Sequence, residues 1–403
     1  MKLFKSLLVA PAALGLISPL VASASETNLN DISSYSDVNT IEFANSFGKD
    51  EVTDKQLIAG GEGLVTESSY DGGFSETTTA SFTADLLFGG VDGGTSALND
   101  PYQATYSFQI DLNTSFTGED SLDISLDAGN TVATAAGVAG TTGTQEFDPN
   151  ITGDNLQVDG VSYTFPVGGA TAFVADNGDA SALFTTACTY AGPTDTLSDC
   201  GNVNAGPILG GVAAGMSYDF GNGFATAIGY QAVNGEEDQG LLTTESTDTY
   251  AINGSYTGSN YGVSLTYASI EDGEHESLTD NAAVEGEDTY TAIQAYYTPD
   301  AEGFPSISVG YEVGEDDSLA VDDEITSFFL GLQWDELGPG SFGLAMGHSN
   351  TAESAEEEYM YEAYYSYPVN DGMTITPVVY VQERSAAGVD DETGLMVKTS
   401  FSF

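Results

Sequence analysis

The stretch ASFTADLLF, residues 80–88, alternates apolar and polar side chains with a period of two. Successive side chains of an extended strand point to opposite faces, so one face would carry alanine, leucine and phenylalanine and the other serine, threonine and aspartate. Residues 105–112 and 122–127 repeat this pattern. The acids on the face away from the apolar side chains are Asp85, Asp111, Asp123 and Asp127. The alternation predicts strands with one apolar and one polar face.

The same period returns after residue 210 and continues to the C-terminus. The expected strands lie at 211–220, 224–232, 248–256, 261–269, 288–298, 305–313, 325–334, 341–348, 359–368, 373–383 and 393–403. Their connections alternate in kind, because short ones rich in glycine and asparagine, such as 221–223 and 369–372, are separated by long acidic ones, such as 271–276 and 353–358. This alternation is typical of an up-and-down barrel with two unlike ends.

The strand count depends on the segment between the two series. Three strands before residue 128 and eleven after residue 207 give 14, an even number that places both ends of the barrel on one side. Residues 128–207 are rich in glycine, threonine and alanine, and we interpret them as one long constriction-type loop folded into the barrel. If residues 156–165 and 171–175 form a hairpin instead, the count becomes 16. The sequence therefore predicts an all-β, transmembrane antiparallel barrel of 14 strands, with 16 as the alternative.

The N-terminal residues have the features of an exported protein. In residues 1–24, two lysines precede an apolar run that closes on Ala22-Ser23-Ala24, as in a cleaved signal peptide. A retained transmembrane helix is the alternative, but two prolines interrupt the run. Residues 25–73 are polar without a sustained period and are interpreted as a periplasmic lead-in. Residues 74–403 would form the barrel.

The composition excludes some partners. The formal net charge is -56, and only Lys49, Lys55, Arg384 and Lys398 follow the signal peptide as basic residues. Nucleic acid is excluded as a partner, because binding phosphates requires clustered lysine and arginine. The chain is 41% hydrophobic and 11% aromatic, which indicates a folded protein and not a disordered acidic one.

Two further features concern the covalent structure and the C-terminus. Cys188 and Cys200 are the two cysteines of the chain, and an even pair in an exported protein indicates a disulfide. The chain ends in LMVKTSFSF, residues 395–403, in which four of the five apolar side chains share a face and the last residue is aromatic. We interpret this ending as the C-terminal insertion signal of an outer-membrane barrel, carried by Leu395, Val397, Phe401 and Phe403.

Several segments resemble one family. Residues 1–4 (MKLF), 76–82 (ETTTASF), 188–190 (CTY) and 197–202 (LSDCGN) resemble the cyanobacterial outer-membrane porins of the iron-uptake type, which are similar to the carbohydrate-selective OprB porins. The resemblance covers about residues 73–403. It implies a homotrimeric porin of the cell outer membrane that passes small solutes such as sugars or inorganic ions. Relatives usually carry an N-terminal surface-layer-homology domain and a coiled coil that grip peptidoglycan; residues 25–73 are too short for both, which argues against tethering here.

A channel requires a polar lumen and a constriction. The alternation of faces along each strand nominates as pore-lining residues Asp85, Asp111, Asp123, Asp127, Glu362, Tyr364, Arg384 and Lys398. Because acids outnumber bases among them, we expect a passive diffusion channel for small hydrophilic solutes with weak cation preference. The plainer interpretation is that these acids are solvated and that size alone sets the constriction.

No catalytic or metal chemistry is expected. Residues 271–276 offer carboxylates and one imidazole, but their spacing matches no calcium loop, and solvated charge explains them better. His275 and His348 lack a partnered nucleophile, so we expect neither an enzyme nor a cofactor. The alternative function is a secreted or surface-layer structural all-β protein without channel activity.

Overall fold

The computed structural model describes residues 77–93, 102–131, 150–206, 210–233, 235–238, 240–243, 246–271, 287–315, 324–353 and 355–403. The chain divides into two compact units, Met1–Glu67 and Ser68–Phe403, and all described residues belong to the second. The signal peptide and the lead-in expected at residues 1–24 and 25–73 lie outside the described residues.

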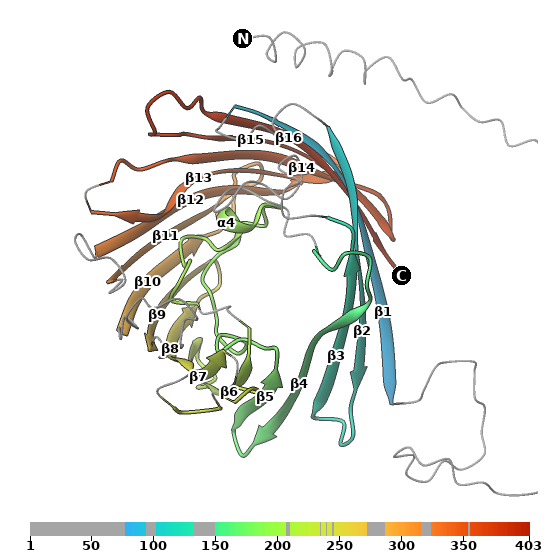
Figure 1. Ribbon diagram of the computed structural model, residues 1–403, viewed down its shortest axis with the longest axis vertical. Coiled ribbons are helices and arrows are strands. Elements are labelled where there is room, and N and C mark those ends of the chain that lie inside the picture. Colours follow the sequence, from blue (N-terminus) through green and yellow to red (C-terminus); the bar gives the residue numbers. More distant parts are fainter. Residues whose placement is uncertain are drawn as a thin grey trace, which may run out of the picture. The chain divides into compact units, whose positions relative to one another are not determined.

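Sixteen strands among these residues form one closed antiparallel barrel (Figure 1). They are β1 (Thr78–Asp92), β2 (Gln103–Thr114), β3 (Ser121–Gly129), β4 (Gln157–Val167), β5 (Ala170–Asp176), β6 (Val212–Asp219), β7 (Phe224–Val233), β8 (Thr247–Thr257), β9 (Tyr261–Glu271), β10 (Glu287–Tyr297), β11 (Ser306–Glu315), β12 (Glu324–Leu337), β13 (Gly340–Ala352), β14 (Met360–Asn370), β15 (Met373–Gln382) and β16 (Glu392–Ser402). Each strand pairs with its neighbours in sequence. One short helix, α4 (Asp195–Ser198), lies inside the barrel (Figure 1). It follows β5 and precedes β6 in the sequence.

The first and last strands close the barrel. β1 pairs with β16 from Thr83 opposite Ser402 to Asp92 opposite Thr393. Beyond the last pair, Phe82 and Phe403 exchange two backbone hydrogen bonds of 3.0 and 3.1 Å, and their rings stack 5.6 Å apart. Closure leaves no unpaired sheet edge, which is the condition for placing strands in lipid.

The expectation of 14 strands is wrong, and the alternative of 16 is confirmed. The segment 128–207 is not one loop, because β4 and β5 form a hairpin inside it with a turn at 168–169. β4 contains Gly160 and Pro166, and β5 is mostly alanine and threonine, so neither strand shows strong apolar alternation. The connection that enters the barrel is residues 177–211.

The two ends of the barrel differ as expected from the connections. At one end the connections are short, for example 221–223 or 371–372, and here β1 begins and β16 ends. At the other end the connections are longer, for example 272–286 and 316–323. We call these the short-turn end and the long-loop end.

The turn between β2 and β3 is organised by one carboxylate at the short-turn end. Asp120 Oδ2 accepts a hydrogen bond from Tyr163 Oη on β4 at 2.7 Å. Its Oδ1 accepts from Thr117 N and Ser115 Oγ at 2.7 and 2.9 Å. The Tyr163 bond and the turn donors favour the ionised form, so the pKa of Asp120 lies well below its ordinary value.

Within the described residues, the structure contains no helix with the length and apolar character required to cross a membrane.

Candidate functional site

The barrel wall is apolar outside and polar inside. On β9, Val263 and Leu265 are 40% and 54% exposed, whereas Ser264 and Thr266 between them are 1% exposed. The same alternation places Asn253 of β8 and Gln294 of β10 inside. A soluble sandwich would bury its large apolar side chains, so this arrangement argues against the soluble all-β alternative and favours a lipid-facing wall.

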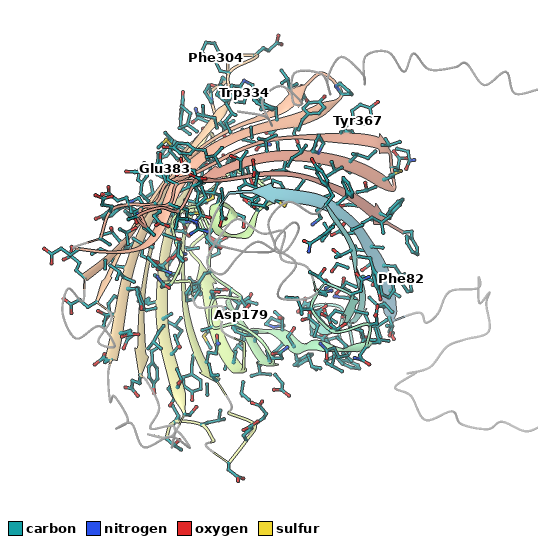
Figure 2. All side chains as sticks on the ribbon, turned by 45° about the horizontal axis from the view of Figure 1, so that its top comes forward. Phe82, Asp179, Phe304, Trp334, Tyr367 and Glu383 are labelled. Atoms are coloured by element: carbon teal, nitrogen blue, oxygen red, sulfur yellow. A yellow bond between two sulfur atoms is a disulfide. The ribbon has the colours of Figure 1, made fainter. Side chains whose placement is uncertain are left out.

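Aromatic side chains gather at the short-turn end of the outer surface. Figure 2 shows Phe304, Trp334 and Tyr367 projecting outward there. Phe304 is 68% and Tyr367 43% exposed, and Trp334 Nε1 donates a hydrogen bond to Gly303 O at 3.1 Å. Such aromatic girdles are typical of the membrane interface of transmembrane barrels.

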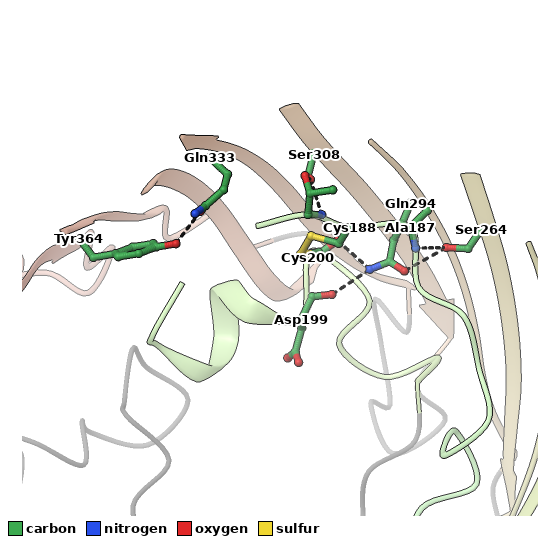
Figure 3. The surroundings of a disulfide bond; sticks show 10 residues. Ala187, Cys188, Asp199, Cys200, Ser264, Gln294, Ser308, Gln333 and Tyr364 are labelled. Atoms are coloured by element: carbon green, nitrogen blue, oxygen red, sulfur yellow. Dashed lines mark hydrogen bonds between the residues drawn. A yellow bond between two sulfur atoms is a disulfide. The ribbon is translucent and has the colours of Figure 1, made fainter. Parts of the chain in front are cut away.

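The described residues of the connection 177–211, which are 177–206, 210 and 211, form a segment, here called the inner loop, that lies against the inner wall. Four of its backbone amides donate to polar side chains of four wall strands. The bonds join Ala180 N to Gln231 Oε1 on β7 (2.9 Å), Thr185 N to Asn253 Oδ1 on β8 (3.1 Å), Ala187 N to Ser264 Oγ on β9 (2.9 Å) and Thr189 N to Ser308 Oγ on β11 (2.9 Å). The β9 and β11 bonds are drawn in Figure 3. The inner loop is therefore fastened along one side of the barrel.

Two glycines let the inner loop approach the wall closely. A Cβ at Gly229 of β7 would lie 1.8 Å from Ala180 O, and a Cβ at Gly310 of β11 would lie 1.8 Å from Cys200 O. Only a residue without a side chain fits where another backbone approaches a strand so closely. These two glycines were not singled out in the sequence, although glycine within a strand is a signal for such an approach.

A disulfide joins the outgoing and returning parts of the inner loop. Cys188 and Cys200 are bonded, as the sequence predicts, and Cys200 is 1% exposed. Gln294 Nε2 on β10 donates to the returning part, at Asp199 O (3.0 Å) and Cys200 O (3.3 Å) (Figure 3). The disulfide therefore clips together two stretches that are each bound to the wall.

The tip of the inner loop covers two of the predicted pore-lining residues. Tyr190 packs against Phe329 and Tyr364, with ring centroids 5.4 and 5.8 Å apart, and donates to Glu362 Oε1 at 2.5 Å. Tyr364 donates to Gln333 Oε1. Glu362 and Tyr364 are each 3% exposed, so they lie under the inner loop and not on an open surface. The alternation of side chains along β14 predicted correctly that both residues face the inside of the barrel. The pattern of a single strand cannot show that another segment covers that face.

Two cavities with polar lining lie along β1–β5 and β16, here called the open side of the barrel. The first, about 810 Å³, lies between β3–β5 and inner-loop residues that include Ala182 and Leu183; the carboxylates of its lining are Asp123, Asp159, Asp176 and Asp179. The second, about 420 Å³, lies along β1, β2 and β16 and includes Asp85 and Lys398, with Pro193 and Ser198 of the inner loop opposite. Asp159 lines both cavities, so they adjoin. In Figure 2, Asp179 lies on the inner side of the wall.

Polar contacts hold three of the predicted residues, Asp85, Lys398 and Asp111, on this open side. Lys398 Nζ forms an ion pair with Asp85 Oδ2 at 3.0 Å. Asp111 accepts hydrogen bonds of 2.8 Å from Gln109 and Ser125. These polar networks hold the carboxylates along the inner face of β1–β3.

The remaining two predicted residues lie elsewhere. Asp127 is 8% exposed near the long-loop end of β3. Arg384 follows β15 and binds Glu358 at 3.3 Å and Glu392 at 2.9 Å, so it joins connections at the long-loop end. Burial of Glu358 opposes its ionisation, but hydrogen bonds from Ser385 and the charge of Arg384 outweigh burial and hold the pKa of Glu358 below its ordinary value.

The structure adds residues that were not predicted. Asp159, Asp176 and Asp179 line the first cavity, and burial raises the pKa of the Asp179 carboxyl. They lie within the segment interpreted as one loop, where no strand parity was assigned. Glu312, 1% exposed on β11, accepts bonds from the inner loop; its inward parity in the expected strand 305–313 could have identified it.

The structure offers little for catalysis or metal binding. The described residues contain no group of three or more His, Cys, Asp or Glu placed to hold a metal ion. His348 Nδ1 lies 3.0 Å from Thr351 Oγ1, and the ring lies beside Phe328 and Tyr359. His275 and most of 271–276 lie outside the described residues. This arrangement resembles no nucleophile, base and acid triad.

Comparisons with known proteins agree with the barrel. No family model matches the sequence. The uncharacterized protein alr4550 of Nostoc sp. is 25% identical in an alignment of 385 positions, which covers 81% of this chain and 66% of that relative's length. OprB of Pseudomonas putida superposes with a TM-score of 0.57 at 15% identity, over 81% of this chain and 94% of OprB.

A second solved structure is OmpT of Vibrio cholerae, an outer membrane protein with loop L8 deleted, with a TM-score of 0.51 at 10% identity over 81% of this chain and 100% of OmpT. At these identities the likeness concerns the fold. With its closed ring of sixteen antiparallel strands, the chain has the barrel fold of the outer-membrane porins.

Proposed function

We propose that this protein is a porin, a passive diffusion channel for small hydrophilic solutes in the cell outer membrane. One observation carries the proposal: an inner loop fastened along β7–β11 of a closed barrel leaves polar cavities between itself and the wall of β1–β5 and β16. A channel needs a polar path and a narrowing that selects by size and charge. The inner loop supplies the narrowing, and the wall of β1–β5 with β16 supplies the path.

The charges on the open side favour weak cation preference. Asp85, Asp123, Asp159, Asp176 and Asp179 line the two cavities, and Lys398 is the basic side chain among the lining residues. Arg384 and Lys398 are the only arginine or lysine in the described part of the chain. A low-dielectric wall concentrates the field of these carboxylates in the passage, which raises the local concentration of cations.

The proposed solutes are inorganic ions, with small sugars as a second class. Charge on the lining favours ions, whereas iron and sugar permeation are suggested only by the resemblance to iron-uptake and carbohydrate-selective porins. The same resemblance supports a cyanobacterial origin, export by residues 1–24 and assembly as a homotrimer. The lipid-facing apolar wall and its aromatic girdle support the membrane location.

The test is planar-bilayer recording of detergent-purified protein in a KCl gradient. Discrete conductance steps with a reversal potential displaced toward that of K⁺ support the proposal. Steps with an anion-displaced reversal contradict the cation preference. Folded protein that inserts but never conducts contradicts the channel and favours the structural surface protein.

A further inference from the structure

Two carboxylates are fully buried between the wall and the inner loop. Glu312 of β11 is 1% exposed and Glu362 of β14 is 3% exposed. Neither takes part in an ion pair of the described residues, whose three salt bridges join Arg384 and Lys398 to other acids. Burying a carboxylate is costly unless hydrogen bonds replace its hydration, so the donors around each group indicate its role.

The donors to Glu312 come from the returning part of the inner loop. Asn204 N and Ala205 N donate to Oε2 at 2.9 and 2.8 Å, and Asn204 Nδ2 donates to Oε1 at 2.8 Å. Asn204 Nδ2 also reaches Asn350 Oδ1 of β13 at 2.6 Å. Glu312 therefore holds residues 204–205, just beyond the disulfide, against β11.

The donors to Glu362 come from the tip of the inner loop. Tyr190 Oη donates to Oε1 at 2.5 Å, and Thr194 Oγ1 donates to Oε2. A Cβ at Gly192, between these two donors, would lie 2.4 Å from Glu362 Oε1. The loop backbone therefore passes directly over this carboxylate, with the disulfide between the two anchor points in sequence.

We infer that Glu312 and Glu362 are positioning residues that anchor the inner loop at two points and so set the width of the passage. The inference rests on the proposed channel function. In this role neither carboxylate lines the passage: each acts on permeation through the loop that it holds. Asp159, which lines both cavities, acts on the permeating ion directly.

The donors around each carboxylate show which substitutions release its anchor. Asn204 N and Ala205 N both donate to one oxygen of Glu312, so the carbonyl oxygen of a glutamine at position 312 can accept from both, and the Asn204 side chain can turn its amide oxygen toward the glutamine NH2 group. The two side-chain donors to Glu362 are hydroxyls, which can rotate and accept from a glutamine amide, and the backbone amide of Thr194 also donates there. Glutamine should therefore retain much of either anchor, whereas Glu312→Leu and Glu362→Leu should lose it.

The channel test compares these variants with Asp159→Asn and with Glu336→Gln, which neutralises an exposed carboxylate of β12. We expect Glu312→Leu and Glu362→Leu to increase open-channel current noise and to admit larger polyethylene glycols than wild type, with the reversal potential unchanged, and the two glutamine variants to resemble wild type more closely. Asp159→Asn should shift the reversal potential away from that of K⁺ without a change in size limit. Glu336→Gln should resemble wild type. If Glu312→Leu shifts the reversal potential and leaves the size limit unchanged, Glu312 lines the passage and the inference is wrong.

A second measurement does not depend on conduction. Hydrogen exchange of the folded full chain in detergent should accelerate about tenfold or more at the Asn204 and Ala205 amides in Glu312→Leu, because one hydrogen bond of ordinary strength protects by about that factor. The amides of β9 should be unaffected. If the wild-type protein fails to conduct but Glu312→Leu shows this local acceleration, the channel is refuted and the anchor is supported. Unchanged exchange at both amides refutes the anchor, whatever the conductance.

Discussion

The close approach of the inner loop to β11 predicts that Gly310→Ala is destabilising. The new Cβ would lie 1.8 Å from Cys200 O and 2.9 Å from Cys200 C, both backbone atoms. An ordinary non-bonded separation is about 3.5 Å, so the carbonyl must move by about 1.7 Å. No side-chain rotation can relieve this contact.

The magnitude follows from what that movement disturbs. Overpacking typically costs about 1–3 kcal/mol, and displacing Cys200 also breaks the two bonds from Gln294, at 3.0 and 3.3 Å, worth about 1 kcal/mol each. Alanine restricts the unfolded chain and offsets about 0.4–1 kcal/mol. The expected net loss is about 2–5 kcal/mol.

The matched control is Gly254→Ala on β8. A Cβ at Gly254 meets no atom within 4 Å, so this variant should be neutral or stabilised by up to about 1 kcal/mol. Unfolding in urea with the barrel in detergent micelles can be followed by the fluorescence of Trp334, the single tryptophan. If the two variants unfold at the same urea concentration, the close packing of loop and wall is refuted.

Three further predictions concern charge, covalent links and pH. Lys398→Gln removes the positive charge that partly neutralises the acids of the open side, so the reversal potential in a KCl gradient should move further toward that of K⁺. The free energy of unfolding should change by less than about 1 kcal/mol, because the ion pair with Asp85 is partly exposed. An unchanged reversal potential would place Lys398 outside the ion path. Reduction of the Cys188–Cys200 disulfide should lower the free energy of unfolding by about 3 kcal/mol, which is the closure entropy of a loop of this size. The channel should still conduct, because the hydrogen bonds between the inner loop and the wall remain. Loss of all conductance on reduction would contradict the role of those hydrogen bonds. The pKa of Asp120 is lower in the folded than in the unfolded protein, so its carboxylate stabilises the fold fully above the unfolded pKa of about 4, and this stabilisation is lost as pH falls through the folded pKa. In urea titrations, the difference in unfolding free energy between wild type and Asp120→Asn should therefore shrink from pH 7 toward pH 2. A difference that stays constant would contradict the prediction.

Much of the wall was predictable because each strand carries its own signal. The expected strand 261–269 corresponds to β9 (Tyr261–Glu271), and 373–383 corresponds to β15 (Met373–Gln382). A wall with lipid on one side and polar groups on the other forces a period of two on the sequence. β4 and β5 were predicted only as the alternative, because their alanine, threonine, glycine and proline residues give little difference in polarity between the two faces of the strand.

The site was predictable only in part. Parity identified Asp85, Asp123 and Lys398, which do line the open-side cavities. It also nominated Glu362, which the inner loop covers. Parity reports the face of a strand, and it carries no information about a segment that later folds against that face.

The sequence by itself therefore determined the barrel, its two unlike ends and the disulfide, since these follow from local alternation, turn composition and a single pair of cysteines. Only the tertiary structure decided the strand number, the side of the barrel on which the inner loop lies and the separation of anchoring from lining carboxylates. The strand number depends on the local β4–β5 hairpin, whose alternation is weak. The other two features depend on contacts between residues more than a hundred positions apart, such as Ala205 with Glu312 and Tyr190 with Glu362. Such contacts leave no periodic trace in either partner's own stretch of sequence, because they are made by backbone amides, hydroxyls and glycines that fit equally well elsewhere.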